Sequence, residues 1–260
     1  MSFQAEVQRY FNEASRTAER YLPEDRISRL LLAGGAATVA GAVLFPLLHH
    51  AVLGRQVIHT YPSTGSLWAS LECGEIENVP KALTEDAKSY RVAHDKVTSH
   101  VRDVTIGLSA DLADDFTGLL RNNFTKFNKT PASWFVWFAY SSATQRESFK
   151  QDHIDNLNFV EGDLVGGAYQ VVKRTPLRAE IAINPAPGYE AVKGLLVISL
   201  RPRNEGATLT SETIQWTEKR NGVALPLESW FGKFLHSLSA RWLVLSGAQY
   251  LRGLASDHIL

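Results

Sequence analysis

A carboxylate interrupts the strand-like segment 207–218. Glu212 lies two positions before Ile214 and four before Trp216, so in an extended strand the three side chains share one face. If that face points inward, Glu212 is a carboxylate removed from water that could donate or exchange a proton with a bound molecule. The alternatives are an outward face or a structural ion pair with a residue such as Arg241. Glu212 is therefore a candidate catalytic residue.

Three further polar side chains accompany apolar neighbours. His236 lies beside the apolar stripe of the last helical segment, and Tyr169 and Tyr140 place hydroxyl groups on strand-like segments. Taken singly, each is more often a hydrogen-bonded residue of an ordinary core. Together with Glu212 they are the groups that we expect to orient a ligand, and they complete the set of candidate catalytic residues.

The chain contains no familiar catalytic motif. H-E-x-x-H, P-loop and G-x-S-x-G patterns are all missing from the sequence. The single cysteine, Cys73, allows neither an intrachain disulfide nor a cysteine-based zinc site. The carboxylates of Asp111, Asp114 and Asp115 could bind a divalent metal, but acidic residues also favour the start of a helix electrostatically, and we prefer that interpretation. We expect no metal and no cofactor.

The last 100 residues or so have the clearest pattern. Strand-like runs at about 163–173, 177–184, 192–201 and 207–218 are joined by short turns, which predicts an antiparallel meander. Pro226 then opens a helix that reaches about Leu254. Its apolar residues recur at helical spacing: Leu227, Phe231, Phe234, Leu235, Leu238, Trp242 and Leu245. The predicted class is α+β, a curved antiparallel sheet gripping a long C-terminal helix, with additional N-terminal helices.

The first half of the chain is less regular. Asp111 could cap a helix running to about Phe124, and the aromatic run Trp134–Tyr140 suits a buried strand. Residues 56–61 and 101–109 alternate as short strands. We predict an N-terminal helical segment over residues 1–53, followed by one ligand-binding unit over residues 54–260.

A twisted sheet with a long helix across its concave face can leave an apolar pocket between the two. We expect large side chains to shape that pocket and bind the substrate, namely Trp137, Trp216, Trp242, Phe138 and Phe234. The alternative is that these aromatic residues simply fill a solid core. The expected partner is an apolar small molecule.

The charge balance excludes one class of partner. Lys and Arg number 27, as do Asp and Glu, and no basic stripe is present, so we do not expect nucleic-acid binding.

The first 26 residues do not resemble a signal peptide, and we expect a cytoplasmic protein. The stretch from Leu30 to Leu48 has 19 residues without a charge, near the length that spans a bilayer. We expect a packed or peripherally associated segment, with a membrane span as the alternative.

Several short segments carry a resemblance. Residues 159–163, 167–171, 212–216 and 230–236 resemble uncharacterised fungal proteins of natural-product clusters. The sheet followed by a long helix resembles the ending of helix-grip proteins related to START domains and polyketide cyclases. The resemblance covers about the last 100 residues. It departs at the N-terminus, where some 50 helical residues replace the usual opening strand and two short helices.

The resemblance implies a cofactor-free cyclase of a terpenoid or polyketide intermediate, acting by a pericyclic [4+2] (Diels–Alder) reaction. Such a reaction needs a near-attack conformation and at most one hydrogen bond to a carbonyl, which fits a chain without a catalytic motif. One alternative is a non-catalytic carrier or lipid binder anchored by Leu30 to Leu48. Another is an acid–base isomerase or dehydratase that uses Glu212 and His236.

Overall fold

An antiparallel sheet forms the centre of the structure. The computed structural model describes residues 48, 50–60, 81–102, 112–140, 142–185 and 190–257. In these ranges seven strands form one sheet in the order β1-β2-β7-β6-β5-β4-β3. The strands are β1 (Ile58–Thr60), β2 (Tyr90–Val101), β3 (Leu164–Val165), β4 (Tyr169–Thr175), β5 (Arg178–Ile183), β6 (Lys193–Arg203) and β7 (Gly206–Glu218). Chain contacts divide the protein into two units, Met1–His49 and His50–Leu260, and all of these strands belong to the second.

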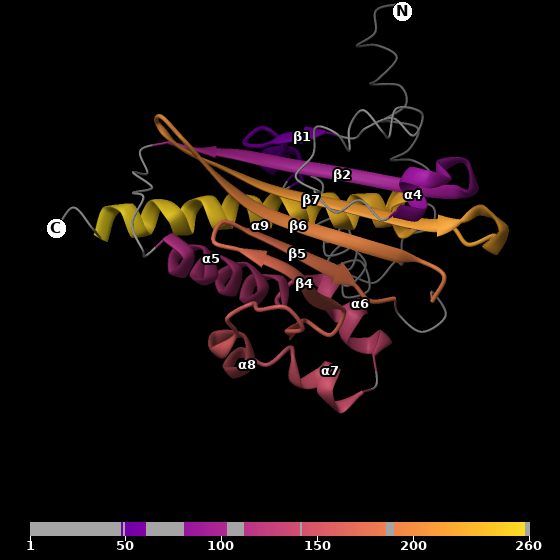
Figure 1. Ribbon diagram of the computed structural model, residues 1–260. Coiled ribbons are helices and arrows are strands. Elements are labelled where there is room, and N and C mark those ends of the chain that lie inside the picture. The colour runs from indigo at the N-terminus through magenta and orange to yellow at the C-terminus, as the bar shows by residue number, and fades with distance from the viewer. Residues whose placement is uncertain are drawn as a thin grey trace, which may run out of the picture. The chain divides into compact units, whose positions relative to one another are not determined.

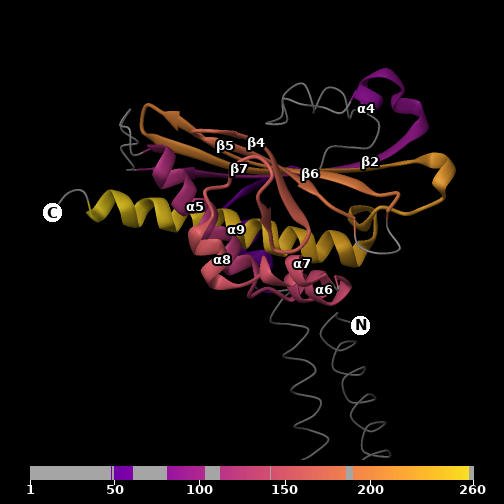
Figure 2. The same cartoon turned by 60° about the horizontal axis from the view of Figure 1, so that its bottom comes forward.

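A long helix crosses one face of the sheet (Figure 1). This helix, α9 (Trp230–Asp257), contacts β2 and β7 and lies beside α5 (Leu112–Phe127). Figure 2 shows further, shorter helices on the same side of the sheet as α9, and α4 (Lys81–Glu85) on the other side. The shorter helices are α6 (Pro131–Ala139), α7 (Ala143–Glu147) and α8 (Gln151–Asn156).

The two faces of the sheet carry different cores. The main core lies between α9, α5 and the sheet, and Leu209 of β7 belongs to it. Ile214 and Trp216 of the same strand pack with Leu83 of α4 on the opposite face, because successive side chains of a strand alternate between faces. We call the face toward α9 the inner face and the face toward α4 the outer face.

The strand β2 lies between β1 and β7, the last strand in the chain. It pairs with β7 over its whole length, with Asp95 opposite Thr213 and Lys96 opposite Glu212. In the sequence, β2 is followed by the helices α5 to α8 and then by the antiparallel strands β3 to β7, the last of which pairs with β2. This arrangement, with α9 across it, is compatible with a helix-grip fold.

The structure confirms the α+β class, the predicted antiparallel meander and the terminal helix. The helix expected up to Phe124 is α5, and the strand expected within residues 56–61 is β1. Residues 103–111, which include the helix cap expected at Asp111, and almost all of the stretch from Leu30 to Leu48 lie outside the described residues. Among the helices that are described, none combines the length and apolar character needed to cross a bilayer.

Two elements differ from the prediction. The run Trp134–Tyr140 was expected as a strand but is mostly the helix α6, which ends at Ala139. Thr130 caps this helix, since its hydroxyl oxygen accepts a hydrogen bond from the backbone N–H of Ser133 at 3.2 Å, and proline stands in its first turn. An all-apolar run fits a strand or a helix equally well, so the cap preceding it carried the decisive information.

The strand β2 was missed. The sequence predicted a strand that starts at Val101, whereas β2 ends there. Both faces of β2 are covered, so it contains a run of buried residues that includes His94 and Asp95. Such a strand lacks the alternation of polar and apolar residues that identifies a strand with one face in water.

Gly206 provides a test of the turn between β6 and β7. Its φ is 115°, and a Cβ atom there would overlap the carbonyl oxygen of Val101. We expect Gly206→Ala to lower the free energy of unfolding by about 1–3 kcal/mol. Gly253→Ala is the control, because this α9 glycine has open space around it and alanine should stabilise the helix by about 0.5–1 kcal/mol. Urea denaturation measures both, and equal effects would contradict the turn geometry.

Candidate functional site

A cavity lies between α9, α5 and the inner face of the sheet. Its volume is about 130 Å³, and its wall is mainly apolar. The apolar wall includes Phe124, Leu196, Ile198, Leu209, Leu243 and Val244. Polar groups enter the wall from α5 at Asn123, from β7 at Thr213 and Gln215, and from α9 at His236 and Ser239. The cavity can therefore surround an apolar group and offer hydrogen bonds at its edge.

Tyr169 lines the cavity from β4. Its ring packs edge-on against Phe124 and Phe127, with centroid distances of 5.7 Å and 5.4 Å. Burial raises the pKa of Tyr169 above its ordinary value of 10.0, and Tyr140 adds a smaller effect in the same direction. The hydroxyl is thus neutral in the physiological pH range and can act as a hydrogen-bond donor.

His236 lines the cavity and contacts a buried carboxylate. Its Nε2 lies 2.9 Å from Oδ2 of Asp95, although the N–H direction is not aligned for a good hydrogen bond. Asp95 is only 3 % exposed, and its other oxygen bonds Nε2 of His59. Burial alone would raise the pKa of Asp95, but the interactions with His236 and His59 outweigh it and hold the pKa well below 3.8. Asp95 is therefore an ionised carboxylate shared by two imidazoles.

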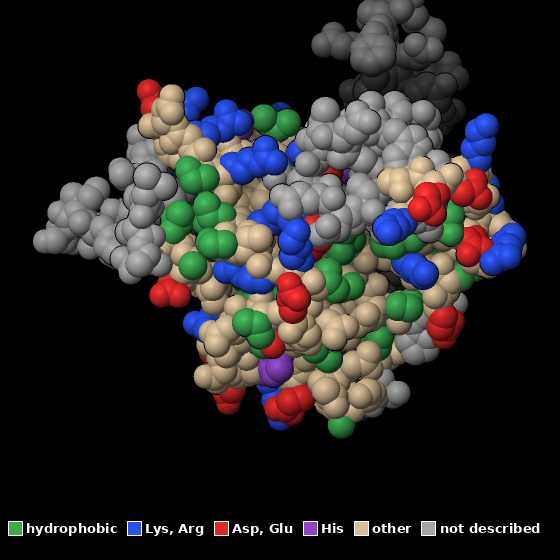
Figure 3. All heavy atoms as spheres, in the orientation of Figure 1, with side chains coloured by type: hydrophobic (Ala, Val, Ile, Leu, Met, Phe, Trp, Pro, Cys, Tyr) green, Lys and Arg blue, Asp and Glu red, His purple; other side chains and the backbone are tan. Residues whose placement is uncertain are grey.

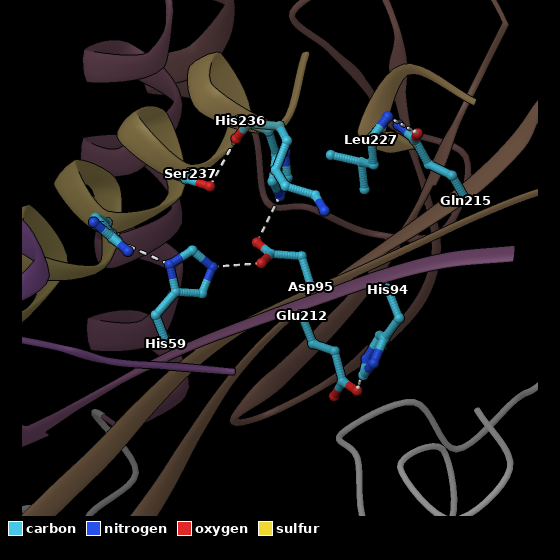
Figure 4. A network of polar contacts seen from close by, with 10 residues as sticks. His59, His94, Asp95, Glu212, Gln215, Leu227, His236 and Ser237 are labelled. Atoms are coloured by element: carbon cyan, nitrogen blue, oxygen red, sulfur yellow. Dashed lines mark hydrogen bonds and ion pairs between the residues drawn. The ribbon is translucent and has the colours of Figure 1, made fainter. Parts of the chain in front are cut away.

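Arg241 determines which nitrogen of His59 carries the proton. Its Nε donates to Nδ1 of His59 at 2.8 Å, and its Nη1 donates to the carbonyl of His50 at 3.0 Å. An arginine nitrogen is always a donor, so Nδ1 of His59 accepts and the His59 hydrogen sits on Nε2, facing Asp95. The chain of contacts thus runs from Arg241 to His59, Asp95 and His236. Figure 4 shows its part from His59 through Asp95 to His236.

Glu212 lies on the outer face. It shares that face with Ile214 and Trp216 as the alternation predicted, but α9 covers the inner face. Glu212 is 0 % exposed, and its Oε1 lies 2.5 Å from Nε2 of His94 (Figure 4). The expected partner Arg241 bonds His59 instead. The structure therefore does not bring Glu212 together with the cavity.

The other predicted residues are dispersed. Tyr140 is buried at the end of α6, where its hydroxyl donates to the carbonyl of Asn184 at 2.6 Å and burial raises its pKa to about 12. Trp137 and Phe138 are exposed on α6. Phe234 stacks on Trp230.

None of the five aromatic residues predicted to bind substrate is among the described residues that line the cavity. Trp216 lies on the outer face with Leu83, and Trp242 is partly buried on α9. The aromatic side chains that do line it are Phe124, Phe127 and Tyr169. Of the predicted set, the structure brings only Tyr169 and His236 to one cavity.

Sequence reasoning missed Asp95 and His59. The sequence did contain a signal for Asp95. In an extended strand its side chain shares one face with the apolar residues Ala93, Val97 and Val101, so it is a carboxylate on an otherwise largely apolar face. No comparable signal marks His59, because β1 has only three residues.

In the described part of the chain, no group of three or more His, Cys, Asp or Glu side chains is placed to hold a metal ion. Comparison with protein-family models, with curated proteins and with solved structures finds no match for this chain.

Proposed function

We propose that this protein binds a small, mostly apolar molecule in the cavity beneath α9, and that His236 exchanges a proton with a polar group of that molecule. The observation that carries the proposal is the position of His236, which lines the cavity while its Nε2 contacts the buried carboxylate of Asp95. A buried carboxylate beside an imidazole that faces a ligand is an arrangement used in general acid–base catalysis. Nδ1 of His236 is then the nitrogen that meets the ligand.

The cavity volume limits what can enter. A cavity of about 150 Å³ in another protein holds a benzene molecule, and drug-sized ligands occupy about 300–1,000 Å³. At about 130 Å³ this cavity accommodates a single ring or a short branched chain. A larger substrate would place one end inside and the rest at the cavity mouth.

The cyclisation implied by the resemblance is the second candidate function. The apolar wall with a few donors supports it, because a pericyclic reaction needs little more than a fixed substrate conformation and one hydrogen bond to a carbonyl. In that case His236 acts only as a donor. The two candidates differ in pH dependence, since proton exchange follows the protonation state of His236 and a pericyclic step does not require it to change.

A cavity-filling substitution tests the binding proposal. Ala240 lines the cavity, whereas Ala248, two turns later on α9, is fully buried and is not among the lining residues. We expect Ala248→Leu to lower the free energy of unfolding by about 1–3 kcal/mol through overpacking. Ala240→Leu should lower it clearly less, because the cavity accepts the added carbons. Urea denaturation measures both variants. Equal costs would mean that the cavity is already filled and would contradict the proposal.

The same variants test ligand contact, with p-cresol as the probe of a single ring carrying one hydroxyl. We expect p-cresol to raise the melting temperature of the wild type and not of Ala240→Leu, and to shift the His236 ring resonances in NMR spectra. The shift should vanish in Asp95→Asn if the carboxylate orients the ring. Binding of p-cresol without any change at His236 would contradict its proposed role.

A further inference from the structure

Two neighbouring helices expose large aromatic side chains. On α6, Trp134 and Phe138 are 58 % and 76 % exposed, and in the first turn of α9 Trp230 and Phe231 are 76 % and 53 % exposed. The helices α6 and α9 contact each other, and Figures 1 and 2 both place α6 beside the first half of α9. Groups of exposed apolar side chains usually mark an interaction surface. We call these four residues, together with Trp137, the aromatic surface.

Packing inside the protein does not explain these residues. The inward positions of the two helices are occupied by other side chains, such as Ser133 and Val136 on α6 and Ala240 on α9. Trp230 is held in place outside the core, because its ring stacks on Phe234 at 5.9 Å with an interplanar angle of 9°. This stacking restricts the Trp230 side chain, so the conformational entropy lost when this side chain docks is smaller.

The composition of the surface indicates the partner. Tryptophan is enriched where proteins meet the interface of a lipid bilayer, because its large apolar ring carries one polar N–H. Three of the five residues are tryptophans, and the guanidinium of Arg146 lies over the ring of Trp137 at 5.1 Å. An arginine beside interfacial aromatic rings can bind lipid phosphate.

The chain preceding the surface supports the same partner. The uncharged stretch from Leu30 to Leu48 ends two residues before His50. The ring of His50 packs on Phe234, with 5.2 Å between centroids, and Phe234 in turn stacks on Trp230. In the sequence, a 19-residue uncharged stretch therefore ends two residues before a histidine whose ring packs on Phe234.

We propose that the aromatic surface of α6 and α9 docks onto the interface of a lipid bilayer. The proposal is independent of the function proposed for the cavity, because it uses neither the cavity lining nor the chain of contacts at Asp95. Burial of one exposed aromatic side chain favours binding by about tenfold or more.

The test is flotation of the full chain with phosphatidylcholine vesicles, with and without phosphatidylserine. We expect the wild type to float and the double variant Phe138→Ser/Trp230→Ser to lose at least about tenfold in partitioning. The control is Val160→Ser/Val172→Ser, which removes two exposed apolar side chains elsewhere in the folded unit and should float like the wild type. Far-ultraviolet circular dichroism confirms that each variant is folded.

A second measurement separates the aromatic surface from the apolar stretch. Lipids with brominated acyl chains quench tryptophan that reaches the membrane, so they should quench the wild type strongly and Trp134→Phe/Trp137→Phe/Trp230→Phe weakly. Equal quenching in the two proteins would overturn the proposal even if both float. A wild type that forms a dimer through this surface and does not bind vesicles would overturn it as well.

Discussion

Replacing Asp95 with Asn is expected to lower the free energy of unfolding by about 3–5 kcal/mol at neutral pH. Asn keeps the shape of the side chain, so the loss reflects the charge and not a cavity. The substitution removes the carboxylate that faces both His59 and His236, and it leaves Arg241 at the end of a buried chain without its counter-charge. Urea denaturation of the two proteins measures the difference.

The pH dependence of this difference has a definite sign. The pKa of Asp95 is lower in the folded protein than its ordinary value of 3.8, so the ionised carboxylate stabilises the fold at pH values above about 4. That contribution is lost as the pH falls from 3.8 through the lower folded pKa. The difference between wild type and Asp95→Asn should therefore shrink in acid.

An exposed carboxylate serves as the control. Asp155 on α8 is exposed, and Asp155→Asn should change the stability by no more than about 0.5 kcal/mol at any pH. If Asp95→Asn is as stable as the wild type at neutral pH, the chain from Arg241 to His236 does not form as described.

The second large effect is expected on the outer face. Glu212→Ala should lower the free energy of unfolding by about 3–5 kcal/mol, because the buried imidazole of His94 loses its carboxylate partner Glu212. Glu212→Gln should cost less, since the amide oxygen can still accept from His94. Denaturation in urea separates the two variants.

A double variant tests the reason for that cost. Replacing a buried polar pair by apolar residues of similar size is often neutral, so Glu212→Met combined with His94→Leu should recover most of the stability lost in Glu212→Ala. Binding of p-cresol should be unchanged in the double variant, because Glu212 lies on the face away from the cavity. Loss of p-cresol binding in a folded double variant would show that the outer face communicates with the cavity.

Each face of the sheet thus carries one buried carboxylate in contact with histidine, Glu212 with His94 on the outer face and Asp95 with His59 and His236 on the inner face. On the outer face, His94 and Glu212 are both buried, and neither is among the described residues that line the cavity beneath α9. On the inner face, Asp95 is buried but His236 reaches the cavity wall. A buried ion pair of this kind is often only structural, whereas an imidazole that lines a cavity can also act on a ligand.

The elements that the sequence determined by itself are those whose signals are local. The strands β4 to β7 follow one another through short turns, and each has its own alternation, so their antiparallel pairing needs no distant information. The helical spacing of Phe231 to Leu245 likewise predicted α9 from its own residues, although α9 begins at Trp230 and the expected start at Pro226 is a separate 3-10 helix, Pro226–Glu228. The face that Glu212 shares with Ile214 and Trp216 followed from alternation alone.

Only the tertiary structure decided where the site lies. Alternation states which side chains share a face but not which face the helix covers, so the same reasoning that grouped Glu212 correctly could not assign it to the outer face. His59 and Asp95 are 36 positions apart, and Arg241 and His59 are 182 apart. They meet because β2 pairs with β1 and β7 while α9 crosses the inner face, and contacts between such distant segments form through the assembled core, which no local pattern encodes.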